Sequence, residues 1–129
     1  MTRFDLVLGE LRSLESRLKA AANRLWAIKL SLAAAREAGQ LETDFLPRRL
    51  TLVERQEQQA FERLLTRLNR LISDQLDSSL IAFSSLEDVA TVASISRTIR
   101  SLHNAFAGEL SLGPTWVRLN AALPAFSKN

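Results

Sequence analysis

Residues 4–35 read FDLVLGELRSLESRLKAAANRLWAIKLSLAAA, and apolar side chains recur along this stretch in alternating steps of three and four. The recurring residues are Phe4, Val7, Leu11, Leu14, Leu18, Ala21, Leu25, Ile28, Leu32 and Ala35. Such a repeat keeps one stripe of a helix turned toward a neighbouring helix over about 50 Å of rise. The pattern therefore predicts a helix over residues 4–38 that packs along another helix and ends at Gly39 in the left-handed conformation.

The second half of this helix is apolar on nearly every side. Trp26 and Leu30 project away from the stripe that the repeat defines. A helix that is apolar all round is covered on more than one side, so we expect residues 20–35 to lie inside a bundle of at least three helices or inside an oligomer. Either Trp116 or a second copy of the chain should cover Trp26, and we favour a core position for Trp26 over a partner surface.

Two further long helices are expected. After a connection over residues 40–46, Pro47 suits the first turn of a second helix that reaches Gln75 or beyond. Ser84 and Glu87 form a capping box that predicts the start of a third helix, which ends at Gly108 or Gly113. Its apolar positions are Val92, Ile95, Ile99, Leu102 and Phe106. Pro114 opens a short last helix that includes Trp116, Val117, Leu119 and Leu123.

The fold class follows from these elements. No stretch alternates apolar and polar residues as a half-buried strand does. A short connection between two long helices makes them antiparallel neighbours. The sequence predicts an all-α single domain over residues 1–129, an up-down-up bundle of three long helices plus a short C-terminal helix, built on a long antiparallel helical hairpin.

Composition excludes several kinds of chemistry. The chain has no cysteine, one histidine and four glycines, and its formal net charge is +3. It therefore has no thiolate catalysis, no metal site with two histidines and no glycine-rich phosphate loop. The N-terminal residues lack the apolar region of a signal peptide. We expect no metal and no cofactor, a coiled-coil-like cytoplasmic protein rather than a membrane one, and a bacterial source.

A row of arginines is the first candidate binding site. Arg63, Arg67 and Arg70 follow one face of the second helix at spacings of four and three. Three aligned guanidinium groups can grip phosphates or an acidic partner. The alternative is a solvated face, which we favour because no aromatic residues are interleaved with the arginines.

The segment RTIRSLH, from Arg97 to His103, resembles the Arg-x(4–6)-His motif of HEPN-type ribonucleases. These are all-α domains in which the paired Arg and His serve RNA cleavage, so the resemblance implies catalytic roles for Arg97 and His103. Six residues along one helix turn the two side chains about 120° apart. Both reach one phosphate only if the helix breaks or a second copy contributes its own pair. The other interpretation of His103, which we favour, is a partly exposed packing residue.

Long amphipathic helices are what this sequence supplies in abundance, and such helices bind other helices. We therefore expect a non-enzymatic protein–protein interaction module, such as an adaptor, chaperone or assembly subunit. Its partner would be a helical protein, and the chain would form a homodimer that buries Trp26 and Leu30, with Trp116 also at the interface. The alternative is an RNA- or DNA-associated helical protein, including a HEPN-like ribonuclease.

Overall fold

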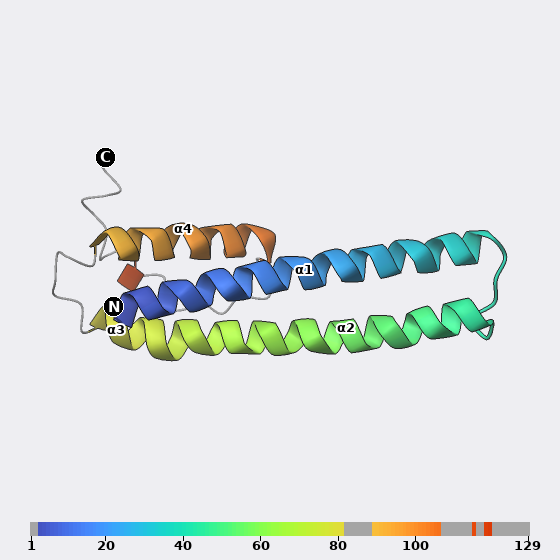
Figure 1. Ribbon diagram of the computed structural model, residues 1–129, viewed down its shortest axis with the longest axis horizontal. Helices are drawn as coiled ribbons and strands as arrows, with labels where there is room; N and C mark the ends of the chain where they lie inside the picture. Colours follow the sequence, from blue (N-terminus) through green and yellow to red (C-terminus); the bar gives the residue numbers. More distant parts are fainter. Residues whose placement is uncertain (1–2, 82–88, 107–114, 116–117, 120–129) are drawn as a thin grey trace. The chain divides into compact units, whose positions relative to one another are not determined.

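The computed structural model describes residues 3–81, 89–106, 115 and 118–119. Figure 1 shows helix α1 (Arg3–Glu37), helix α2 (Phe45–Arg70), helix α3 (Asp77–Ile81) and helix α4 (Val89–Ala105). Between α2 and α3 lies the π-helical turn η1 (Leu71–Leu76). Apart from residues 38–44 and Phe106, every residue in these ranges is helical. The predicted all-α class is confirmed for this part of the chain.

The chain divides into two compact units, which we describe separately. Unit 1 consists of Met1–Glu15 and Leu65–Asn129, and unit 2 consists of Ser16–Leu64. Unit 1 therefore contains the first turns of α1, the last turns of α2, and η1, α3 and α4. Unit 2 contains the remaining parts of α1 and α2 and the connection between them. That residues 1–129 form a single domain stays a prediction.

Helix α1 ends where the sequence predicts, and for the predicted reason. Gly39 has φ +82°, a left-handed conformation that is strained for any residue with a Cβ atom. The N–H of Gln40 donates to the carbonyl of Ala35 and the N–H of Gly39 to that of Arg36, both at 3.0 Å. These two bonds make a Schellman motif, which satisfies carbonyls that the helix leaves unpaired.

The connection to α2 lies two residues earlier in the sequence than predicted. Helix α2 begins at Phe45 rather than after Leu46, so residues 38–44 form the connection. Asp44 closes it, because its Oδ2 accepts a 2.7 Å hydrogen bond from the N–H of Leu41. Pro47 lies in the first turn of α2, as predicted, where its missing N–H leaves no intrahelical bond unmade.

Unit 1 holds most of the core. The predicted apolar positions Val92, Ile95, Ile99 and Leu102 of α4 are all buried, and Phe106 is half-buried just beyond the helix end. Figure 1 shows α4 beside the first turns of α1, where the Thr91 hydroxyl donates to Asp5 Oδ1 at 3.2 Å. Leu119, from the predicted last helix, is also fully buried.

Within unit 1, Arg118 forms an ion pair with the first residue of α3. Arg118 Nη1 lies 2.6 and 2.5 Å from the two carboxylate oxygens of Asp77.

The capping box of Ser84 and Glu87 lies outside the described residues. So do Gly108, Gly113, Trp116, Val117 and Leu123.

The π-helical turn η1 has a physical cause in the sequence. Leu68, Ile72, Leu76 and Leu80 are spaced by four, and all are buried. On an ideal α-helix each step of four drifts about 40° around the axis, so three steps would carry the last side chain well off the buried face. A π-helical turn bonds i to i+5 and so contains more residues, which removes part of the drift. The N–H of Asp77 donating to the Ile72 carbonyl is one such bond.

Unit 2 is made of two helical segments that lie side by side and are joined at one end by the connection, as Figure 1 shows. The buried side chains of α1 in this unit are Leu18, Ala21, Leu25, Leu32 and Ala35. Arg24 Nε donates to Glu57 Oε2 at 3.0 Å, which joins the two segments. Over its whole length the predicted stripe of α1 is buried at every position except Ile28, which is half-buried.

No helix in the described part of the chain is both long enough and apolar enough to cross a membrane.

We predict that two glycine substitutions change stability in opposite directions. Gly9→Ala, in the middle of α1 with nothing within 4 Å of the added Cβ, should stabilise the fold by about 0.5–1 kcal/mol. Gly39→Ala places a Cβ in the left-handed conformation and should destabilise the fold by about 1–2 kcal/mol. Urea unfolding followed by circular dichroism measures both, and shifts of the same sign would contradict the assigned helix end.

Candidate protein-interaction surface

Exposed apolar side chains gather in unit 2. Among the described residues, six of the seven exposed large apolar side chains belong to unit 2 and one, Leu6, to unit 1. The six are Trp26, Leu30, Leu41, Phe45, Leu46 and Leu52. Two antiparallel helices can cover each other on one side only, so their outer sides stay in water. Exposed apolar clusters of this kind mark interaction surfaces.

The first cluster lies on the outer side of α1. Trp26 is 66% exposed and Leu30 is 53% exposed. Trp26 lies about 130° and Leu30 about 170° around the helix from the buried stripe. Among the described residues, Trp26 therefore does not occupy the favoured core position. Trp116, its expected cover within the chain, lies outside the described residues. That a second copy covers this side stays a prediction.

The second cluster is the Phe45–Leu52 face, which we define as Phe45, Arg48, Arg49 and Leu52. These residues line one surface hollow on the first turns of α2. Phe45 is 81% exposed and Leu52 is 51% exposed, and both lie about 160–180° around α2 from the buried Phe61. Steps of three, one and three residues put the four side chains on one face of the helix, with the two arginines between Phe45 and Leu52.

The charges of this face are not balanced within unit 2. Arg48 and Arg49 are exposed, and neither makes an ion pair with another described residue. The nearby Glu42 is held by Arg36, whose Nε lies 2.8 Å from its Oε1. No acidic residue lies in the first turn of α2, although a helix N-terminus favours negative charge there. The local preference of the helix therefore does not account for these two arginines.

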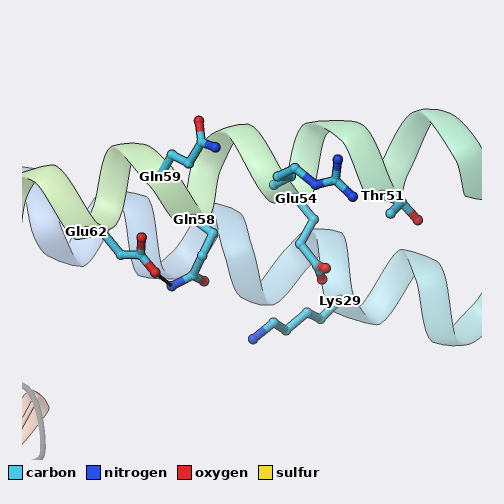
Figure 2. Close-up of a pocket in the computed structure, with 7 residues that line it drawn as sticks. Lys29, Thr51, Glu54, Gln58, Gln59 and Glu62 are labelled. Carbon is cyan, nitrogen blue, oxygen red and sulfur yellow. Dashed lines mark hydrogen bonds between the residues drawn. The ribbon is translucent and has the colours of Figure 1, made fainter.

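A second hollow of unit 2 is polar. It runs along the side of α2 and is lined by Lys29, Thr51, Glu54, Arg55, Gln58, Gln59 and Glu62. Figure 2 shows Lys29 and Glu54 projecting from facing helices into the same space. Gln58 Nε2 donates to Glu62 Oε1 at 3.4 Å. Its cations and carboxylates are mixed, so this hollow favours no particular charge in a ligand.

The predicted arginine row does not form one described site. Arg63 belongs to unit 2, whereas Arg67 and Arg70 belong to unit 1. All three are exposed, but Arg67 Nε lies 3.1 Å from Glu10 Oε1. An exposed pair of this kind contributes about 0–1 kcal/mol, and it offsets the charge of Arg67.

Arg97 and His103 lie on one unbroken helix. Helix α4 runs from Val89 to Ala105, so the helix break that would let both residues reach one phosphate does not occur. Both side chains are exposed, and Arg97 Nη2 donates to Ser94 Oγ at 3.0 Å. A ribonuclease site would therefore need residues from a second copy. Within the described ranges, no group of three His, Asp or Glu side chains could hold a metal ion.

Sequence reasoning missed the Phe45–Leu52 face. A signal was present, because Phe45 and Leu52 are seven residues apart and lie opposite the apolar positions Leu50 and Phe61. The predicted helix start, after Leu46, placed Phe45 in a loop and hid this spacing.

Comparisons with protein-family models, with curated proteins and with solved structures found no match for this chain.

We predict that the chain does not bind single-stranded RNA or double-stranded DNA, even at low salt. The net charge is only +3, and Glu10 pairs with one of the three arginines of the row. Fluorescence anisotropy with labelled oligonucleotides measures this. The contrary result is binding that weakens as salt rises and weakens further when Arg63, Arg67 and Arg70 are replaced by Gln.

Proposed function

We propose that this chain is a non-enzymatic protein–protein interaction module, an adaptor, chaperone or assembly subunit, that binds a helical segment of a partner protein. The observation that carries the proposal is the gathering of exposed apolar side chains in unit 2. Most of the buried apolar side chains lie in unit 1, whereas the outer sides of the two helical segments of unit 2 carry exposed ones that a partner could cover.

The Phe45–Leu52 face supports a partner of particular chemistry. Aromatic residues and arginines are enriched where interfaces gain most of their binding energy. A guanidinium group forms paired hydrogen bonds with a carboxylate, which Arg48 and Arg49 lack among the described residues. The complementary ligand is an amphipathic helix with an apolar stripe flanked by Asp or Glu.

We also propose the finer architecture that the sequence indicates. The complete chain would be an up-down-up bundle of three long helices with a short C-terminal helix, built on the antiparallel hairpin of α1 and α2. The lack of cysteine in the sequence supports a cytoplasmic location.

We predict that a labelled synthetic helix with leucines on one face and flanking glutamates binds the wild-type chain, and that the same peptide with lysines in place of the glutamates does not. The double variant Arg48→Glu with Arg49→Glu should weaken binding of the acidic peptide by about ten-fold or more and gain binding of the basic one. Fluorescence anisotropy titrations measure all four combinations.

A matched variant separates this face from net charge. Arg55→Glu with Arg63→Glu makes the same change of charge on exposed residues of the same helix, and it should leave the preference for the acidic peptide unchanged. Equal binding of the two peptides to the wild type would contradict the proposal, as would an equal loss with both double variants.

A further inference from the structure

The outer side of α1 carries a second repeat in steps of four and three. Its members are Lys19, Asn23, Trp26, Leu30, Ala33 and Glu37, which we call the outer seam. All six are exposed and all belong to unit 2. A stripe with this spacing can pack along one neighbouring helix, as the buried stripe of the same helix does. Helix α1 therefore carries two seams on opposite sides, and only the inner one is buried in the chain.

The outer seam is complementary to itself when it is reversed. Trp26 and Leu30 lie at its middle, Lys19 lies at its N-terminal end and Glu37 at its C-terminal end. In an antiparallel pair of outer seams centred on residue 28, Trp26 faces Leu30 of the second copy, and Asn23 faces Ala33. Lys19 then faces Glu37 at both ends of the pair. In a parallel pair, Lys19 would face Lys19 and Glu37 would face Glu37, which is unfavourable.

We infer that the outer seam of α1 is the self-association surface of this protein, and that it pairs with the outer seam of a second copy in the antiparallel direction. The inference rests on the proposed interaction function and deepens it by naming one partner. A two-fold axis then makes the same contacts twice, since each residue pair recurs on the other side of the axis. The small side chains of Asn23 and Ala33 allow the two helices to approach closely on either side of the tryptophans.

Cysteine cross-linking tests the direction of pairing, because the chain has no cysteine of its own. Asn23→Cys mixed with Ala33→Cys should give a disulfide-linked dimer on mild oxidation. Asn23→Cys alone should not, since in the antiparallel pair its two copies lie about 15 Å apart along the axis. Asn23→Cys mixed with Ser31→Cys is the matched control, because Ser31 is exposed but lies on another side of α1.

Sedimentation velocity tests the surface itself. The wild type should be dimeric at about 50 μM. Leu30→Ala should raise the dissociation constant by about ten-fold or more, whereas Leu6→Ala, the same change at an exposed leucine of α1 in unit 1, should not. Circular dichroism shows whether each variant remains folded.

Three results would overturn the inference. They are a wild type that stays monomeric at this concentration, efficient cross-linking of Asn23→Cys to itself, and equal effects of Leu30→Ala and Leu6→Ala. None of these outcomes depends on Arg48 and Arg49, and Leu30→Ala should still bind the acidic peptide. Failure of self-association and failure of the proposed partner site are therefore distinguishable.

Discussion

The burial of one apolar stripe along α1 is the constraint on which the rest of the structure depends. In unit 2 this stripe is covered by α2, and Arg24 and Glu57 pair at its edge. In unit 1 the stripe continues through Phe4, Val7, Leu11 and Leu14, all of them buried. Successive side chains of a helix point in fixed directions around its axis, so burial of the stripe sets the direction of every other side chain of α1. Trp26 and Leu30 are then turned away from the chain's own core.

The two units use this constraint differently. In unit 1, α4 and Leu119 also cover the stripe, and the large apolar residues that the structure describes there are nearly all buried. Unit 2 has no third helix among its residues, so its outer sides keep apolar groups in water. Such groups contribute nothing to the stability of the isolated chain, and they gain about 25 cal/mol per Å² when a partner covers them. We therefore propose that unit 2 carries the interaction surface.

Much of the fold could be predicted from the sequence because it depends on local spacing. The repeat of α1 indicated its buried face, and Gly39 indicated its end. The π-helical turn was missed although the four-residue steps from Leu68 to Leu80 favour it, because the spacing alone does not show whether the packing of the folded chain requires such a turn. The position of Trp26 was missed for another reason. The apolar residues around Trp26 in the sequence indicate that another group covers it. The spacing of apolar residues does not tell whether that group belongs to the same chain.

Tryptophan fluorescence tests the two-seam account of α1 most directly. The chain has two tryptophans and no tyrosine, so Trp116→Phe leaves Trp26 as the only strong emitter. At low concentration the emission should resemble that of tryptophan in water and be readily quenched by acrylamide. As concentration rises, the emission should shift to shorter wavelength and quenching should weaken, because a second copy covers the ring. Emission from a shielded tryptophan at every concentration would place Trp26 in the chain's own core and contradict the account, as would full exposure at every concentration.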